Sequence, residues 1–540
     1  MLATKFQTID NKIEEEYSRL NPIEHRKKYA QFFTPYSIAD FMAKWILGNK
    51  ELKNVLEPAF GLGIFSRILL NYNKTLNIKG FEVDEKIFDV AVNFFQKNHN
   101  IDIKLNDYIC SDWESKYDGI ICNPPYFKFH DYDNKTLLKE IEEKIGFKLS
   151  GFTNLYAIFL LKSIYQLAAN GRAAYIVPSE FLNSDYGKLV KSYLVKSKTL
   201  RHIIVINFNE NVFDDALTTA SILLLANDGE LGKVQFTNVN SVSEIKKLDR
   251  LIQLYPDRNE NAQTVNFEHL NPEIKWKSFY QKQNSPKYKN LVPFSDFGKV
   301  VRGIATGAND YFVFNRSKAK KIGIENKYLI PCITRAIDAK TNFFRLEDFN
   351  ELEYNDKPVY LLNAVEPIDK NVSEYIALGE KEEINKKFLT ATRKPWYSLE
   401  KRPPSPIWVS VFNRSGLRFI KNEAGLSNLT TFHCIYPNKN SLFSDIHIDL
   451  LFAYLITDIA KEIFEDNQRE YGNGLMKFEP NDINKAKILD LNQLNQNTRK
   501  EILENFYLYR QNTIENESDD LYIDKNNDIL SEYFIRPEFK

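Results

Sequence analysis

The stretch Gly119-Ile120-Ile121-Cys122-Asn123-Pro124-Pro125-Tyr126 decides the fold and the site predicted for this chain of 540 residues. Its first four residues are small or apolar and predict a short buried strand. The next four residues predict a turn that ends this strand. In such a turn the Asn123 side-chain oxygen and the Pro124 carbonyl oxygen are paired acceptors beside the Tyr126 ring. Because Pro124 and Pro125 restrict the backbone and lack an N–H donor, the stretch predicts a rigid pocket for a planar amine.

Such a pocket suits chemistry at an amino nitrogen. An exocyclic amine on a purine ring is a poor nucleophile, because its lone pair is delocalised into the ring. Two acceptors bonded to its N–H groups would localise that lone pair without a strong base. The ring of Tyr126 would stack on a base turned out of its duplex. The four residues 123–126 alone leave an alternative open, which is an ordinary proline-rich turn after a buried strand.

Strands and helices alternate on both sides of this stretch. The expected strands are residues 54–56, 78–83, 101–105, 119–122, 172–177, 203–206 and 220–226, and the expected helices are 64–70, 85–96 and 155–169. This alternation predicts an α/β fold with a doubly wound, mostly parallel sheet. In such a sheet, ligands bind at the carboxyl ends of the strands.

Residues that could bind a ligand stand at the ends of three earlier strands. The turn Glu57-Pro58-Ala59, with Gly61, follows the first strand, Glu82 closes the second, and Asp107 with Tyr108 follows the third. A glycine allows close approach of the backbone to a ligand, and a carboxylate suits a ribose diol. Asp107 can accept from an adenine amine while Tyr108 packs on the ring. A cap or a solvated turn explains each of them singly, but their order at consecutive strand ends predicts one site.

The ordered set resembles the γ-class N6-adenine DNA methyltransferases of the TaqI and Eco57I type. The matching segments are Gln31-Phe32-Phe33-Thr34-Pro35, Glu57-Pro58-Ala59, Phe81-Glu82-Val83-Asp84, Asp107-Tyr108 with Asp118, Asn123 to Tyr126, Asn211-Val212-Phe213 and Arg302 to Asn309. The resemblance spans most of the chain and is weaker in the second half. It implies a class I S-adenosylmethionine-dependent methyltransferase fold, followed by a second, mixed α+β domain that recognises DNA.

The resemblance also implies which residues bind the cofactor, S-adenosyl-L-methionine. These are Thr34 and Ala59 at its methionine part with Glu57 nearby, Gly61 in the adjoining turn, Glu82 at the ribose hydroxyls, and Asp107 and Tyr108 at the adenine. The implied catalytic set is Asn123, Pro124, Pro125, Tyr126 and Phe213. Asn123 and Pro124 would accept from the target N6, and Tyr126 and Phe213 would enclose the flipped base. For Phe213 a core position after a strand is the open alternative.

The second half of the chain has a different composition. We expect a catalytic domain over residues 1–245 and a target-recognition domain over 246–540 that ends in a helical segment. From about residue 271 basic residues are interleaved with aromatic ones, a pattern that suits phosphate contacts and packing in a groove of double-stranded DNA. The candidate DNA-binding residues are Lys275, Lys277, Lys282, Arg302, Arg393, Lys394, Trp396 and Arg402. For a single lysine the alternative is a solvated surface position.

Overall composition limits other classes of protein. The 72 basic and 72 acidic residues give a net charge of zero, so any DNA binding depends on local segregation of charge. The four cysteines have no CxxC spacing, which argues against a zinc site or a disulfide framework, and no metal is expected. No long apolar run and no signal-peptide pattern is present, which predicts a cytoplasmic protein without a membrane partner.

The leading hypothesis is a site-specific adenine-N6 DNA methyltransferase that acts by base flipping in a restriction–modification system. We expect a monomer that methylates only, with any cognate restriction endonuclease a separate protein, because few residues precede Thr34. A methyltransferase acting on RNA or on a protein glutamine amide is the alternative, which the size of the second half disfavours. A non-catalytic DNA-specificity subunit with an inactive methylase fold is a third hypothesis, which the intact acceptors and carboxylates disfavour.

Overall fold

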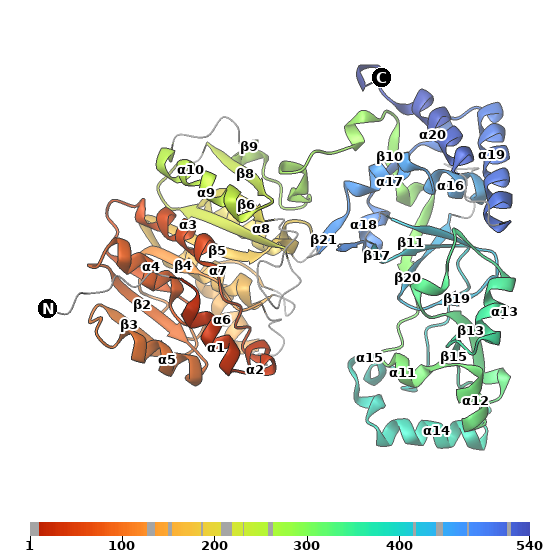
Figure 1. Cartoon of the computed structure of the whole chain (residues 1–540), viewed down its shortest axis with the longest axis horizontal. Coiled ribbons are helices and arrows are strands. Elements are labelled where there is room, and N and C mark those ends of the chain that lie inside the picture. Colours follow the sequence, from red (N-terminus) through yellow and green to blue (C-terminus); the bar gives the residue numbers. More distant parts are fainter. Residues whose placement is uncertain are drawn as a thin grey trace. The chain divides into compact units, whose positions relative to one another are not determined.

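The computed structural model divides the chain into two compact units (Figure 1). The first comprises residues 1–282 with 470–474, and the second comprises 283–469 with 475–540. The structure describes residues 10–126, 135–149, 154–184, 187–206, 219–230, 232–256, 263–413, 417–438, 447–471, 475–515 and 520–539. Within these ranges no helix has both the length and the apolar character needed to cross a bilayer.

A nine-stranded sheet of order β3-β2-β1-β4-β5-β7-β6-β8-β9 forms the centre of the first unit (Figure 1). Its strands are β1 (Asn54–Glu57), β2 (Asn77–Glu82), β3 (Ile101–Leu105), β4 (Tyr117–Cys122), β5 (Leu167–Pro178), β6 (Leu200–Ile206), β7 (Ala220–Ala226), β8 (Lys233–Val239) and β9 (Gln263–Asn266). The strands from β3 to β5 are parallel to their neighbours, whereas β7 is antiparallel to both β5 and β6. The predicted doubly wound, mostly parallel sheet is confirmed.

Helices cover both faces of this sheet. They are α1 (Lys12–Leu20), α2 (Ile23–Lys28), α3 (Tyr36–Leu47), α4 (Ile64–Tyr72), α5 (Glu85–Phe95), α6 (Lys135–Ile145), α7 (Leu155–Gln166), α8 (Gly187–Ser197), α9 (Val242–Lys247) and α10 (Asp249–Leu254). Successive strand side chains point to opposite faces. Val55 therefore packs in the core that contains α3 and α4, and Leu56 packs in the core that contains α7. Because α7 is buried along nearly its whole length, any polar side chain on it must find a partner inside the protein.

The first unit extends beyond the boundary expected at residue 245. Strand β9 pairs with β8 at the edge of the sheet. Trp276 is fully buried, and its ring centroid lies 6.1 Å from that of Phe236 in β8. These contacts join residues 263–282 to the first unit, so Lys275, Lys277 and Lys282 belong to it. Strands β8 and β9 follow the last strand expected from the sequence, 220–226, so a boundary at residue 245 precedes the end of the sheet.

The second unit mixes short strands and helices, as predicted. Its strands include β10 (Leu291–Pro293), β11 (Gly298–Arg302), β12 (Val313–Phe314), β13 (Leu329–Ile333), β14 (Phe343–Phe344), β15 (Tyr360–Leu362), β16 (Ile407–Ser410), β18 (Phe419–Asn422), β19 (Ser427–Asn428), β20 (Phe432–Pro437) and β23 (Lys487–Leu489). Most of them form a five-stranded sheet, β11-β20-β16-β18-β14, and a four-stranded sheet, β12-β15-β13-β19. Its helices are α11 (Asn309–Phe312), α12 (Arg316–Ile322), α13 (Leu346–Tyr354), α14 (Lys370–Lys381), α15 (Phe388–Ala391), α16 (Ile448–Leu455), α17 (Asp458–Glu465), α18 (Pro480–Asn484), α19 (Gln496–Ile514) and α20 (Leu521–Phe534).

Candidate active site

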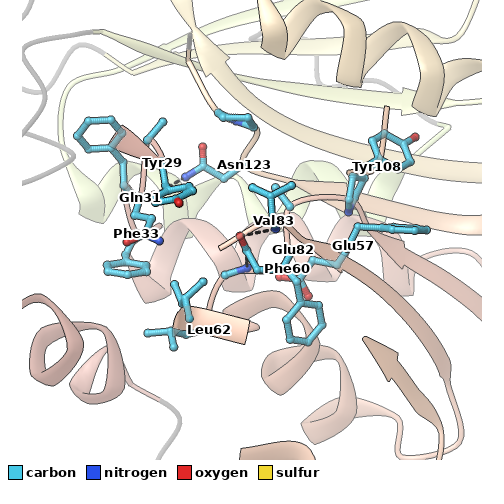
Figure 2. A pocket seen from close by; sticks show the side chains of 18 of the residues that line it. Tyr29, Gln31, Phe33, Glu57, Phe60, Leu62, Glu82, Val83, Tyr108 and Asn123 are labelled. Carbon is cyan, nitrogen blue, oxygen red and sulfur yellow. Dashed lines mark hydrogen bonds between the residues drawn. The ribbon is translucent and has the colours of Figure 1, made fainter. Parts of the chain in front are cut away.

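A cavity of about 430 Å³ lies at the carboxyl ends of β1, β2 and β3 in the first unit (Figure 2). It is lined by all seven predicted cofactor-binding residues, which are Thr34, Glu57, Ala59, Gly61, Glu82, Asp107 and Tyr108. Asn123 and Pro125 also line it, and the segment from Lys28 to Thr34 closes one side. The structure therefore brings together residues that the sequence places at four separate strand ends and before α3.

Glu57 is buried where β1 ends, with 1% of its surface exposed. Its Oε2 accepts hydrogen bonds from the backbone N–H of Ser66, at 3.0 Å, and from the Ser66 hydroxyl. Ser66 lies in the first turn of α4, so the carboxyl group occupies the positive end of a helix. Burial nevertheless raises the pKa of Glu57 to about 8, because the ionised form loses its hydration. A cation in the cavity would favour the ionised form.

The turn between β1 and α4 requires glycine at two positions. Gly61 has φ of 52° and Gly63 has φ of 69°, both in the left-handed region. A Cβ atom on Gly63 would lie 2.6 Å from Phe95 and 2.7 Å from Phe60. The tight turn lets the Gly61 N–H reach into the site.

Glu82 closes β2 with its carboxylate held by three backbone donors. Its Oε2 accepts from the Gly61 N–H at 2.9 Å. Its Oε1 accepts from the N–H groups of Val83 at 2.8 Å and Asp84 at 3.0 Å, and Figure 2 shows Glu82 and Val83 side by side. Burial raises the pKa of Glu82, while these donors oppose that shift. Because Oε2 has a single bond in this network, it has lone-pair capacity for a hydroxyl group.

Asp107 and Tyr108 follow β3 and differ in where their side chains lie. Asp107 Oδ1 accepts from the Ile109 N–H at 2.8 Å and lies at the cavity. Tyr108 is only 1% exposed, and its hydroxyl donates to Gln166 Oε1 at 2.7 Å. Its ring centroid lies 5.1 Å from that of Phe159. The Tyr108 ring, which is expected to pack on the adenine ring, is therefore anchored in the α7 layer while it lines the cavity.

The amide of Asn123 is oriented by the segment that precedes α3. Its Nδ2 donates to the Phe32 carbonyl at 2.8 Å and to Thr34 Oγ1 at 3.1 Å. Its Oδ1 accepts from the Tyr126 hydroxyl at 2.8 Å, and that hydroxyl also lies 3.2 Å from the Ile176 carbonyl. Both N–H groups of the amide are used, so its oxygen points away from Thr34. In the described part of the chain Pro124 and Tyr126 do not line the cavity, and Phe213 lies outside the described residues.

Sequence reasoning missed the residues that hold the N-terminal segment over the cavity. Asp84 Oδ2 accepts from Gln31 Nε2 at 2.5 Å and contacts His25 Nε2 at 2.8 Å, while Asp84 Oδ1 accepts from the Lys86 N–H where α5 begins. Asn11 Nδ2 donates to the Thr34 carbonyl at 3.1 Å. Gln31 and Asp84 stand in segments that carry the family resemblance, but nothing in the sequence indicated that their side chains meet.

Three of the predicted DNA-binding arginines lie together in the second unit. Arg393 donates to the carbonyls of Thr306, at 2.8 Å, and Ala305. Arg402 donates to the carbonyl of Arg302, whose guanidinium is 2.7 Å from Glu479 and largely exposed. These contacts place the arginines around the turn 302–306 and also stabilise that turn.

The other predicted DNA-binding residues are dispersed. Lys394 is exposed, and Trp396 packs with its ring centroid 5.5 Å from that of Tyr311. Lys275 is half-buried and Lys282 exposed in the first unit, where Lys277 is only 6% exposed. The burial of Lys277, beside Trp276 in the core, differs from the exposed phosphate-binding lysine that was predicted.

Two protein-family models match this chain, and together they cover most of it. The model of N-6 DNA methylases matches residues 18–291, and that of the C-terminal domain of Type II methyltransferase M.Eco57I matches 278–522. The Type II methyltransferase M.AccI of Acinetobacter calcoaceticus is 63% identical over 99% of both chains. The Type II methyltransferase M.XamI of Xanthomonas campestris pv. amaranthicola is 22% identical over 88% of both chains.

Two solved structures share the fold at low identity. The DrdV–DNA complex matches with a TM-score of 0.51 and 13% identity, covering 84% of this chain and 56% of that one. A nuclease-deletion mutant of LlaGI with a DNA substrate mimic matches with a TM-score of 0.51 and 13% identity, covering 92% and 58%. The predicted class I methyltransferase fold and the resemblance to the TaqI and Eco57I type are thus confirmed. The chain belongs to the N-6 DNA methylase family and is a Type II DNA methyltransferase.

Proposed function

We propose that this protein transfers a methyl group from S-adenosyl-L-methionine to the N6 amino group of adenine in a specific sequence of double-stranded DNA. The observation that carries the proposal is the orientation of the Asn123 amide beside the cavity. Its two N–H groups are bonded to Phe32 and Thr34, so its oxygen is the atom available to an incoming amine. A hydrogen-bond acceptor fixed in this way can bind the N–H groups of an amino nitrogen that is to be methylated, whereas a ring carbon as methyl acceptor has no such N–H group.

The cavity fits the proposed cofactor in the chemistry of its donor set. S-adenosylmethionine carries an ammonium group, a ribose diol and an adenine amine, and its sulfonium supplies an activated methyl group. Glu57 would face the ammonium, the lone pairs of Glu82 Oε2 would accept a ribose hydroxyl, and Asp107 would accept from the adenine amine. The order of these carboxylates along β1, β2 and β3 matches the order of the three groups along the molecule.

The protein's own groups would position the target amine. Asn123 Oδ1 and the Pro124 carbonyl would accept from its two N–H groups and draw the nitrogen toward tetrahedral geometry. The Tyr126 hydroxyl occupies one lone pair of Asn123 Oδ1, and an amide oxygen has two. The target amine can therefore bond to Asn123 while Tyr126 remains in place.

The rest of the proposal concerns the DNA. Extrusion of the target base from the duplex would place it against Tyr126, with Phe213 as the other wall. The second unit would recognise the sequence, with Arg302, Arg393, Lys394, Trp396 and Arg402 as candidate contacts. We further propose a cytoplasmic monomer that methylates only and whose cognate endonuclease is a separate protein.

The experiment offers four methyl acceptors to the purified protein with radiolabelled S-adenosylmethionine. They are plasmid DNA from cells that express this protein, the same plasmid after amplification in vitro, total RNA and a glutamine-containing peptide mixture. The proposal expects label in the amplified, unmodified DNA alone, with saturation at a fixed number of sites per molecule. Label in RNA or peptide would favour the alternative acceptors and overturn the DNA assignment.

A further inference from the structure

Helix α7 places buried polar side chains beneath the turn that follows β3. Lys162, Ser163 and Gln166 are each 0% exposed. Lys162 Nζ donates to the carbonyls of Tyr108 and Ser111, and Gln166 Nε2 donates to the carbonyls of Asp112 and Ser115, the latter at 3.2 Å. The turn of residues 107–112, which carries Asp107 to the cavity, is thus held by α7 side chains that do not themselves line the cavity.

Lys162 also lies between two aromatic rings. Its Nζ is 4.1 Å from the ring centroid of Tyr108 and 4.6 Å from that of Trp113, both within the range of cation–π attraction. Burial lowers the pKa of Lys162 to about 7, although Asp112 and Asp107 act in the opposite direction. A lysine that only filled space here would be costly compared with a methionine, because burying a charge is unfavourable.

We propose that Lys162 is a positioning residue for the adenine of the cofactor, acting through the turn 107–112 to hold Asp107 at the cavity. The inference rests on the proposed function, since it takes S-adenosylmethionine as the ligand. Lys162 itself does not line the cavity, so its effect on binding passes through the backbone that it bonds. Ser163 and Gln166 complete this support by bonding the Tyr108 hydroxyl.

The test uses Lys162→Met in the full-length protein, with S-adenosylhomocysteine as the ligand in titration calorimetry. We expect about a tenfold weaker Kd, the size typical of coupling between residues in contact. In methylation assays KM for S-adenosylmethionine should rise while kcat at saturation stays near that of the wild type. Lys162→Gln keeps two N–H donors without the charge and should weaken binding less, and it decides the test if Lys162→Met fails to fold.

A matched control is available in α8. Lys191 is 2% exposed and donates to the carbonyls of Ile274 at 2.6 Å and Leu182 at 3.4 Å, away from the cavity. Lys191→Met should lower thermal stability as another buried lysine does, without changing the Kd for S-adenosylhomocysteine. Equal loss of affinity in both variants would show a general effect of destabilisation and overturn the inference.

A double-mutant cycle with Asp107→Ala tests whether Lys162 affects the Kd through Asp107. If Lys162 acts by holding Asp107, then adding Lys162→Met to Asp107→Ala should change the Kd by less than about twofold. The same tenfold loss in both backgrounds would overturn the inference while leaving the cofactor assignment intact. Failure of the wild type to bind S-adenosylhomocysteine would instead overturn the cofactor assignment and the inference together.

Discussion

The hydrogen bond from Asn123 to Thr34 gives the most specific prediction about catalysis. Thr34→Val keeps the shape of a β-branched side chain and removes the hydroxyl that accepts from Asn123 Nδ2 at 3.1 Å. The amide then retains the bond to the Phe32 carbonyl at 2.8 Å as its remaining support on this side. Its correct orientation should therefore be less strongly favoured over the flipped one.

The magnitude follows from the value of one hydrogen bond. A neutral bond contributes about 0.5–1.5 kcal/mol, and a change of about 1.4 kcal/mol in an activation free energy is tenfold in rate. We therefore expect kcat to fall about two- to tenfold in Thr34→Val. The Kd for S-adenosylhomocysteine should stay within about twofold, because the bond that is lost orients the acceptor of the target amine.

The assay is single-turnover methylation of a DNA duplex at saturating cofactor, with Thr34→Ser as the matched control. The serine variant keeps the hydroxyl and should retain most of the wild-type rate. A Thr34→Val enzyme with an unchanged rate would refute the claim that this bond orients the amide. A loss confined to cofactor affinity would instead support the methionine contact implied for Thr34 by family resemblance.

Two further predictions concern charge at the cofactor and at DNA. With a carboxyl pKa raised to about 8, Glu57 is mostly protonated at pH 6. An ammonium ligand favours the ionised form of Glu57, so the affinity for S-adenosylhomocysteine should rise with pH. Between pH 6 and 8 calorimetry should show a rise in affinity of up to about tenfold per pH unit. In Glu57→Gln the affinity should depend little on pH. A wild-type affinity that does not change with pH would contradict the role of Glu57. Exposed Lys394 is a proposed phosphate contact, so Lys394→Ala should weaken DNA binding and reduce the slope of log K against log salt by about one, measured by fluorescence anisotropy. Lys500→Ala, at a lysine 79% exposed on α19, is the control and should change neither quantity; equal effects would remove Lys394 from the interface.

The sequence predicted the first unit well where its patterns are local. Strand β3 has the bounds 101–105 that its alternation of apolar and charged residues indicated, and β7 has the bounds 220–226 that its apolar run indicated. The helix expected over 155–169 ends earlier, at Gln166, because Leu167 already pairs with Tyr117 of β4. In the C-terminal segment α20 begins at Leu521 among charged residues, and its Ile523 is buried.

The site was predictable to the extent that it lies at strand ends. The order of Glu57, Glu82 and Asp107 was enough to place one cavity, because carboxyl ends of parallel strands meet at one edge. The contacts of Asp84 with Gln31 and His25 were not predictable, since they join side chains far apart in the chain and leave no periodic pattern. For the same reason the sequence did not show that Tyr108 turns into the α7 layer.

In the proposed reaction Asn123 and its neighbours direct the methyl group to N6 of adenine. The measurement is mass spectrometry of nucleosides from duplex DNA treated with the wild type and with Asn123→Ala. We predict N6-methyladenine as the methylated nucleoside from the wild type, and almost none from Asn123→Ala at unchanged affinity for S-adenosylhomocysteine and DNA. Methylated cytosine from the wild type, or N6-methyladenine from the variant at a similar rate, would contradict it.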